Sequence, residues 1–532
     1  MSQPAPRVKS EPHPLRETFF SDASQTREAP RASGADTAPR EVSMSPLRRL
    51  VFDRRSLHAV AAGCVALAAG GVVLLRAPTP GVTAPVAVTA APPSRDGLSR
   101  APRRTVTGPQ LTARVALSQG SVDRRAPGHV FAVVDLDADR RADEARRAPI
   151  ALALVVDVSG SMAGEKIVQA RRAVLDTLSA MRDDDRVALV TYSDSASVVQ
   201  PLARVGAVRS RLESVVPTLE TISGTNIPAG LEAGAAALGD GSDDLVRRVV
   251  LVSDGRDGSG QSLDSVAGGV RLRADRGVTL SSLGVGADYD DAYMSRVADA
   301  GRGNYEFLRD GMQLRAFLGR ELDAAERTNV DRATLDLDLP DGWRLHRAYG
   351  VEPESRGAHL RLPIGAMSAG EHRRVVLDLV VDPSRGPDAA SAGALGMSLA
   401  WRAVPDRRDV RLSVQALPLA VVDDPASALA SRDAAVFADA QSVALAARQQ
   451  DAVEAWRSGR GAEAESIARS NVVALQALQA AAPSPARAAQ IARYNSDGTH
   501  FNQMSASSDE GRAYGLGSNA LHRRAMRSGS GY

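Results

Sequence analysis

Three short stretches of the sequence offer oxygen atoms that could bind a metal ion. The first reads Asp157-Val-Ser159-Gly-Ser161 and presents one carboxylate and two hydroxyls close together. Later stretches place Thr225 just before a helix-like segment and Asp254 at the end of an apolar run. Hard divalent cations such as Mg²⁺ and Ca²⁺ prefer oxygen ligands of these kinds. The sequence therefore offers Asp157, Ser159, Ser161, Thr225 and Asp254 as candidate ligands of a divalent cation.

The segments around these residues alternate between strand and helix patterns. Residues 150–156 form a continuous apolar run, which is typical of a parallel strand buried on both faces. Residues 164–181 then repeat apolar side chains at helical spacing. Because similar units continue to about residue 325, we predict a doubly wound, Rossmann-like α/β domain over residues 150–326. In such a domain the binding site lies at the carboxyl ends of the strands, where these ligands fall.

The pattern Asp-x-Ser-x-Ser, followed by a Thr and then an Asp, resembles the metal-ion-dependent adhesion site (MIDAS) of von Willebrand factor type A (VWA) domains. All five positions of that pattern are present here in order. The resemblance implies a bound Mg²⁺ or Ca²⁺ that accepts an Asp or Glu side chain from a protein partner. It also implies that a shift of the last helix, residues 312–325, changes the affinity of the site.

The segments outside the α/β domain predict a second kind of architecture. Residues 327–422 contain short alternating strands separated by Pro and Gly turns, which predicts an antiparallel β-sandwich. Two strand-like runs within residues 107–149 are predicted to join that sandwich, so that the α/β domain is inserted into it. Residues 423–482 predict a C-terminal helical segment, and the Ser-, Gly- and Arg-rich residues 483–532 predict an irregular tail. This order of parts also resembles bacterial membrane-anchored proteins described as calcium-activated chloride channel-like.

The N-terminal part predicts a membrane anchor. Residues 1–56 have little apolar periodicity and are expected to be disordered and cytoplasmic. Residues 57–76 form a nearly uncharged stretch long enough to cross a bilayer, and arginines are more frequent before it than after it. We therefore expect a single-pass transmembrane signal anchor in the inner (cytoplasmic) membrane, a linker over residues 77–106, and an extracytoplasmic remainder. A cleaved signal peptide, which would make the protein secreted, and a buried apolar run are the alternatives.

Composition limits the possible functions. A net charge of +2 argues against nucleic acid as the main partner. The single cysteine, Cys64, excludes intramolecular disulfides. Histidine is scarce and absent from the ligand-bearing loops, so no general base is visible and we predict a binding protein that is not an enzyme. A hydrolase accessory that uses the metal to polarise water, and a scaffold whose metal is structural, are the rival hypotheses.

Two further groups of acidic residues are candidates of lower weight. Residues 183–185 are three consecutive aspartates, for which we expect a solvated turn in preference to a cation cluster. Asp288, Asp290 and Asp291 could add negative charge to the rim of the α/β domain or cap the helix that follows.

Overall fold

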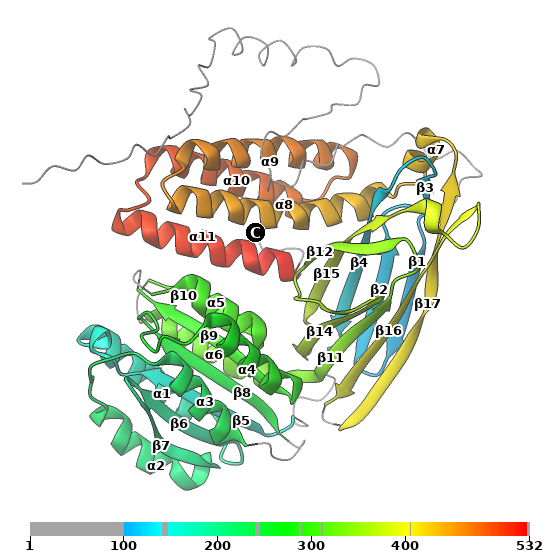
Figure 1. Cartoon of the computed structure of the whole chain (residues 1–532). Coiled ribbons are helices and arrows are strands. Elements are labelled where there is room, and N and C mark those ends of the chain that lie inside the picture. The colour runs from blue at the N-terminus through cyan, green and yellow to red at the C-terminus, as the bar shows by residue number, and fades with distance from the viewer. Residues whose placement is uncertain are drawn as a thin grey trace, which may run out of the picture. The chain divides into compact units, whose positions relative to one another are not determined.

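The computed structural model describes residues 100–140, 147–239, 245–286, 289–309, 312–404 and 406–528. The predicted cytoplasmic segment 1–56, the predicted anchor 57–76 and most of the predicted linker lie outside these ranges. Within them, no helix has the length and apolar character needed to span a membrane. The described chain comprises an α/β domain, a β-sandwich and a set of long helices (Figure 1).

The α/β domain is built on one six-stranded sheet with the order β10-β9-β8-β5-β6-β7. Neighbouring strands pair in parallel except at the β6–β7 edge, where the pairing is antiparallel. Strand β5 is buried at every position, as its apolar run predicts. The strands are β5 (Ile150–Asp157), β6 (Arg186–Tyr192), β7 (Ala196–Arg204), β8 (Val246–Ser253), β9 (Val278–Val285) and β10 (Arg302–Leu308).

Helices cover both faces of this sheet, and each face has its own apolar core. One core includes side chains of α1, α2 and α6, whereas the other includes side chains of α3, α4 and α5. The helices are α1 (Glu165–Ala180), α2 (Val205–Val215), α3 (Ile227–Leu238), α4 (Leu263–Asp275), α5 (Asp291–Ala300) and α6 (Met312–Glu326). The edge strand β7 and helix α2 were not predicted, because their burial alternates weakly and gives little periodic signal.

The sandwich consists of two sheets that enclose a third apolar core. The first sheet has the order β1-β2-β4-β15-β12, and the second has the order β13-β14-β11-β16-β17-β3. Strand β1 begins at Arg103, so the predicted linker boundary at residue 106 is wrong: the last four residues of that linker pair with β2. The strands are β1 (Arg103–Gly108), β2 (Leu111–Leu117), β3 (Ser121–Asp123), β4 (Gly128–Ala138), β11 (Thr328–Asp338), β12 (Trp343–Tyr349), β13 (Glu354–Arg356), β14 (His359–Ser368), β15 (His372–Val381), β16 (Ser391–Ala403) and β17 (Arg408–Val422).

Long helices follow the sandwich and pack against the outer face of its first sheet, where Phe131 and Val376 contribute to a shared core. They are α7 (Pro425–Ala430), α8 (Ala434–Arg457), α9 (Gly461–Ala481), α10 (Pro485–Gln503) and α11 (Asp509–Ser528). The prediction of an irregular tail over residues 483–532 is therefore wrong, since α10 and α11 occupy residues 485–503 and 509–528.

Tertiary packing explains why this tail is helical. Its glycines lower helix propensity, but Gly515 lies against Arg457 and Trp456 of α8, where a side chain would be crowded. At the centre of the helices, the fully buried Asp497 accepts hydrogen bonds from Gln449 at 2.9 Å and Tyr514 at 2.5 Å. These contacts lie far apart in sequence, so local pattern reasoning missed them.

The α/β domain enters and leaves the sandwich at one polar junction. Arg147 makes two hydrogen bonds of 2.7 Å to Asp185 and an ion pair of 3.2 Å with Glu326 at the end of α6. Asp185 is fully buried, so the prediction of a solvated turn fails for this residue, although Asp183 and Asp184 are exposed. Burial opposes its ionisation, but the hydrogen bonds from Arg147 and two backbone amides outweigh burial and lower the pKa of Asp185.

The last helix of the α/β domain is fixed by a second buried polar cluster. Glu321 of α6 accepts hydrogen bonds from Arg248 at 2.8 Å, Ser281 at 2.7 Å and Asn304 at 2.7 Å. These three donors belong to the neighbouring strands β8, β9 and β10. Only Arg327 separates α6 from the sandwich strand β11. A displacement of α6 would therefore act directly on the second sheet of the sandwich.

Candidate metal centre

The two predicted carboxylate ligands follow adjacent strands. Asp157 ends β5 and Asp254 immediately follows β8, and these strands pair in parallel. From β5 the chain continues to β6 on one side, and it returns to β8 on the other side after α3. The two carboxylates therefore lie at the point where the strand order reverses, which is where ligands bind in open α/β sheets.

Asp157 is buried and held by three hydrogen bonds. It accepts from the Ser159 amide at 2.7 Å, from the Ser253 hydroxyl at 2.7 Å and from the Tyr192 hydroxyl at 3.2 Å. Burial raises the pKa of Asp157 above its usual range, the charge of Asp254 adds to this effect, and the hydrogen bonds oppose it. A cation placed between the two carboxylates would relieve their repulsion.

The two serines connect these carboxylates. The hydroxyls of Ser159 and Ser161 lie 3.0 Å apart, and the Ser161 hydroxyl donates to Asp254 Oδ1 at 2.7 Å. Ser159 and Asp254 are each 1% exposed, whereas Ser161 is exposed. The oxygens thus lead from the buried strand ends to the surface.

Thr225 reaches the same place from a third loop. Its neighbour Gly224 has a φ of 88°, and a side chain there would collide with the Asp194 carboxylate. The Thr225 carbonyl accepts from the Gly258 amide at 2.8 Å, which ties this loop to the one that follows Asp254. A Cβ atom on Gly255 would lie 3.5 Å from the Thr225 hydroxyl oxygen and 3.6 Å from that of Ser161. The structure therefore brings all five predicted residues together.

Three residues around the site were missed by sequence reasoning. Tyr192 and Ser253 hold Asp157 from the ends of neighbouring strands, and Lys166 forms an ion pair with Asp254. Lys166 also donates to the Ser161 carbonyl at 3.4 Å, and its side chain is 34% exposed. Lys9 and Lys166 are the only lysines of the sequence, and this rarity is the signal that could have marked Lys166.

The donor set fits a hard divalent cation. It contains two carboxylates and three hydroxyls, and all of these atoms are oxygens. In the described residues no three His, Cys, Asp or Glu side chains gather as a metal cluster, so a site here depends on the hydroxyls as well as the acids. The contact of the Lys166 ammonium with Asp254 shows that this carboxylate attracts a cation.

The acidic residues near α5 have structural partners. Asp290 caps α5 by accepting from the Tyr293 amide at 3.0 Å, so helix capping is the correct alternative for this residue. Asp291 pairs with both terminal nitrogens of Arg457 at 2.8 Å, which joins α5 to α8. Asp288 lies outside the described residues.

Comparison with known proteins identifies the domain. Residues 151–320 match the family model of the von Willebrand factor type A domain. The chain carries a VWA domain. Domains of this family commonly bind a divalent metal ion and often serve as metal-dependent adhesion domains in protein interactions. The match includes all five residues of the candidate metal site.

Relatives and solved structures extend this likeness. The chain is 26% identical to the Escherichia coli protein YfbK over 243 residues, which are 43% of this chain and 42% of that protein. A VWA protein structure from Catenulispora acidiphila covers 72% of this chain and 91% of its own, with 18% identity and a TM-score of 0.56. The ArnB paralog VWA2 from Sulfolobus acidocaldarius covers 79% and 99%, with 14% identity and a TM-score of 0.55. These two structures establish a shared fold that extends beyond the VWA domain.

Proposed function

We propose that this protein is a membrane-anchored binding module that captures a protein partner through a divalent cation held at the metal site of its VWA domain. The partner offers an Asp or Glu side chain. The observation that carries the proposal is that five oxygen-bearing side chains from three loops lie close together. Two of these side chains, Asp157 and Asp254, are buried carboxylates. A second protein can approach this point because Ser161 is exposed and Thr225 is half-buried.

The charge of the site supports the capture of a carboxylate. Asp157, Ser159, Ser161, Thr225 and Asp254 would hold Mg²⁺ or Ca²⁺, and two carboxylates with three neutral hydroxyls would leave a divalent ion electropositive. The bound ion would supply one open position for an oxygen of the partner. Tyr192 and Ser253 keep Asp157 oriented. The Lys166 side chain is partly exposed, so it can move away from Asp254 into solvent when a metal ion binds.

Partner capture is proposed to act on the rest of the protein through α6. This helix contributes Leu314 and Phe317 to the core beneath α1, whose N-terminal end follows the metal loop. A shift of α6 would pass through Arg327 into β11. The metal site and the sandwich are therefore connected through α1 and α6.

We further propose that the protein is not an enzyme. This proposal is supported by the hydrogen bonds of the five site residues, none of which joins them to a histidine of the described part of the chain, since histidine is the commonest general base. A metal-dependent hydrolase accessory and a scaffold with a structural metal remain the rival functions. Residues 57–76 provide the anchor in this proposal, and the described part faces away from the cytoplasm.

The proposal is tested by comparing matched carboxylate variants of the full chain in mild detergent. Calorimetry measures the uptake of Mg²⁺ and Ca²⁺, and affinity capture from an envelope extract is run with and without a chelator. We expect Asp254→Asn to lose both activities. The control Asp264→Asn removes an exposed carboxylate of α4 and should keep both.

Three outcomes would contradict the proposal. Absence of divalent-ion uptake by the folded protein would remove its basis. Partner capture that survives Asp254→Asn, together with a lower melting temperature, would favour the scaffold. Chelator-sensitive hydrolysis of phosphoesters or peptides would favour the enzyme.

A further inference from the structure

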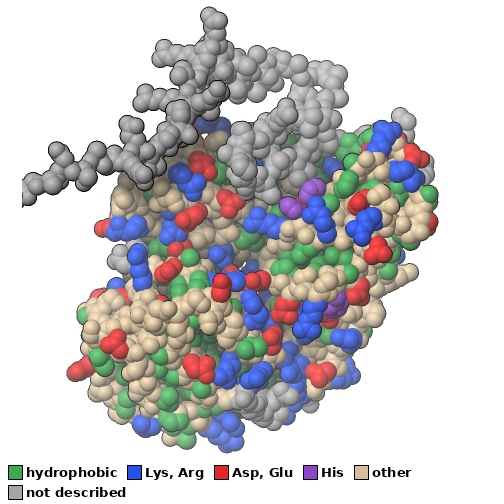
Figure 2. Space-filling view, in the orientation of Figure 1, with side chains coloured by type: hydrophobic (Ala, Val, Ile, Leu, Met, Phe, Trp, Pro, Cys, Tyr) green, Lys and Arg blue, Asp and Glu red, His purple; other side chains and the backbone are tan. Residues whose placement is uncertain are grey.

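A second charged region lies where three parts of the described chain meet. Helices α4 and α5 of the VWA domain, strands β12, β14 and β15 of the sandwich and helix α11 contribute to the lining of a cavity of about 450 Å³. This volume falls in the range that small-molecule sites occupy, roughly 300–1,000 Å³. In the space-filling view, basic side chains gather at the junction between the VWA domain and its neighbours (Figure 2). We call this region the arginine cavity.

Arginine dominates the lining of the cavity. Seven guanidinium groups line it, together with two carboxylates, those of Asp299 and Glu352. The arginines are Arg271, Arg296, Arg302, Arg347, Arg373, Arg523 and Arg527. Three of them also reach carboxylates behind the lining, because Arg302 pairs with Asp275, Arg373 pairs with Glu371 and Arg296 lies 3.8 Å from Asp264. Seven guanidinium groups thus share five carboxylates, which leaves an excess of two positive charges.

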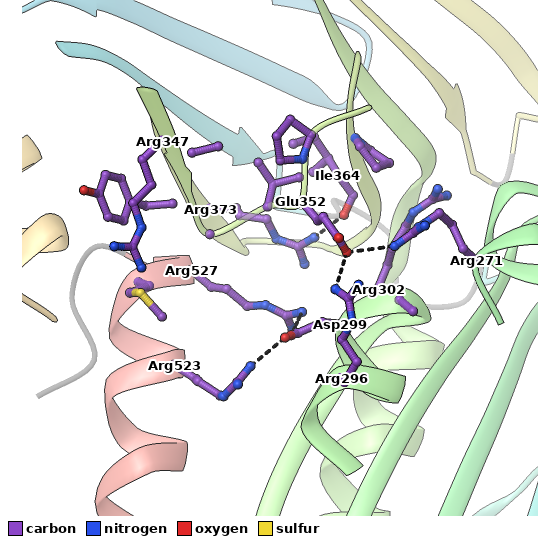
Figure 3. Close-up of a pocket in the computed structure, with 18 of the residues that line it drawn as sticks. Arg271, Arg296, Asp299, Arg302, Arg347, Glu352, Ile364, Arg373, Arg523 and Arg527 are labelled. Carbon is purple, nitrogen blue, oxygen red and sulfur yellow. Dashed lines mark hydrogen bonds and ion pairs between the residues drawn. The ribbon is translucent and has the colours of Figure 1, made fainter. Parts of the chain in front are cut away.

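The carboxylates of the lining are shared between arginines. Glu352 accepts from Arg271 at 2.8 Å and from Arg296 at 2.6 Å. Asp299 accepts from Arg523 at 2.6 Å and from Arg527 at 2.9 Å. Figure 3 shows both pairs of arginines directed at their carboxylates across the cavity. Each acid therefore neutralises half of the charge that faces it.

Two donors of the cavity lack an acceptor within the described part of the chain. Arg347 is exposed at the rim, and its guanidinium stacks on the ring of Tyr349 at 5.3 Å without an ion pair to a described residue. The Nε atom of Arg523 is buried and has no hydrogen-bond partner there. Buried donors are normally satisfied, so these two donors are available to a ligand in the cavity.

The geometry points to a small anion that carries phosphate groups. We propose that the arginine cavity binds such a polyanion, with a charge of about two or more, between the VWA domain, the sandwich and α11. Guanidinium groups are planar forks that pair with phosphate oxygens by two parallel hydrogen bonds, whereas a single carboxylate would neutralise only one excess charge. A bound anion would contact all three parts and hold them together.

The source of the phosphate groups can be a free phosphoester or a lipid headgroup. Both present the same oxygens to arginine, and the experiment below separates them. The proposal is independent of the metal site, since none of the five ligand residues lines the cavity.

The test measures binding of inorganic pyrophosphate to the full chain by calorimetry. A chelator and the Asp254→Asn background exclude binding through a metal. Arg347→Gln removes the rim charge without breaking an ion pair between described residues. Its matched control is Arg344→Gln, which removes an exposed charge from the same strand, β12, outside the cavity.

We expect pyrophosphate to bind, and Arg347→Gln to weaken binding roughly tenfold, because one charge-assisted contact is lost. Arg344→Gln should leave the dissociation constant unchanged. Absence of binding at millimolar pyrophosphate, or equal losses in the two variants, would overturn the proposal. Vesicles that contain phosphatidic acid form the second arm: release of the chain from them by pyrophosphate identifies a lipid source, and absence of vesicle binding identifies a free anion.

Discussion

At the carboxyl edge of the VWA sheet, two carboxylates meet three hydroxyls and one lysine, whereas at the junction with the sandwich and α11 seven guanidinium groups share five carboxylates. The candidate metal site is rich in carboxylates, and the arginine cavity is rich in guanidinium groups. The metal site is built within 98 residues of one domain, from Asp157 to Asp254, and the arginine cavity draws on residues from 271 to 527. Opposite charges are thus concentrated in different parts of one folded unit.

This difference shows how each region balances buried charge. In the metal site, hydroxyls and an amide stabilise Asp157, and Lys166 brings a positive charge to Asp254. In the arginine cavity, carboxylates on the cavity wall already neutralise part of the excess. Removing a carboxylate should therefore have opposite effects in the two regions: it weakens cation binding in the first and strengthens anion binding in the second.

The largest expected effect is the loss of metal binding in Asp254→Asn. We expect Mg²⁺ affinity to fall by roughly 100-fold or more, because even residues that only orient metal ligands change affinity by about 10–100-fold. Pyrophosphate binding should keep its dissociation constant. Calorimetry with each ion measures both values, and a parallel loss of pyrophosphate binding would show that the two regions are coupled.

Gly224→Ala tests the backbone of the metal site without touching a ligand. A Cβ atom at this position would lie 1.6 Å from an oxygen of Asp194, and the φ of 88° is unfavourable for alanine. The left-handed backbone alone costs about 1–2 kcal/mol. We expect a lower melting temperature and weaker Mg²⁺ binding, measured by calorimetry.

The control for this loop is Gly260→Ala, which has a similar φ of 74° but no atom within 4 Å of the added Cβ. It should lower the melting temperature less and preserve Mg²⁺ affinity. Equal metal binding by Gly224→Ala and the parent protein would show that the contact with Asp194 does not position Thr225.

Glu352→Gln tests the effect of removing a carboxylate from the arginine cavity. The substitution removes a negative charge from the arginine cavity and frees Arg271 and Arg296 for a ligand. We expect pyrophosphate to bind roughly fivefold more tightly, an effect that salt should reduce because the groups are partly exposed. Weaker binding in this variant, titrated at low and high salt, would contradict the assignment of the cavity as an anion site.

The smallest expected effect is the acid dependence of stability. Burial opposes ionisation of Glu352, but its hydrogen bond with Arg296 and the charge of Arg271 outweigh burial and lower its pKa below the ordinary 4.5. Because the folded pKa is the lower one, this stabilisation is present above about pH 4.5 and is lost as pH falls through the folded pKa. Melting temperatures between pH 6 and 3 should fall less steeply in Glu352→Gln than in the parent.

Glu354→Gln is the matched control for this titration, since it lies on the same segment and leaves the pairs of Glu352 with Arg271 and Arg296 intact. Its acid dependence should follow that of the parent. Identical slopes in all three proteins would show that these ion pairs do not contribute to stability.

The proximity of the five candidate ligands could be predicted because each of them is part of a local pattern. Asp157 and Asp254 end or follow apolar strands, and the carboxyl ends of parallel strands meet at one edge of a sheet. Apolar alternation likewise predicted the α/β fold that the family comparison supports. The second layer of the site, which includes Tyr192 and Lys166, was missed because a side chain that only supports a ligand has no pattern of its own.

The arginine cavity and the C-terminal helices had no comparable local signal. Arginines are frequent throughout the chain, so those of the cavity differ from the rest only in what they face. Residues 483–532 contain many glycines and serines, which predict irregular structure, but they form helices that pack against α8. In both cases the deciding interactions join residues that are distant in sequence.

Local sequence patterns were therefore sufficient to predict the VWA domain and its candidate cation ligands, since the strand ends and loops of that one domain carry these residues. The arrangement of the sandwich and α11 around Glu352 and Asp299, and with it the excess of positive charge, arises only when distant segments fold together. The physical reason is that periodicity reports which face of an element is buried, but it carries no information on which element covers that face.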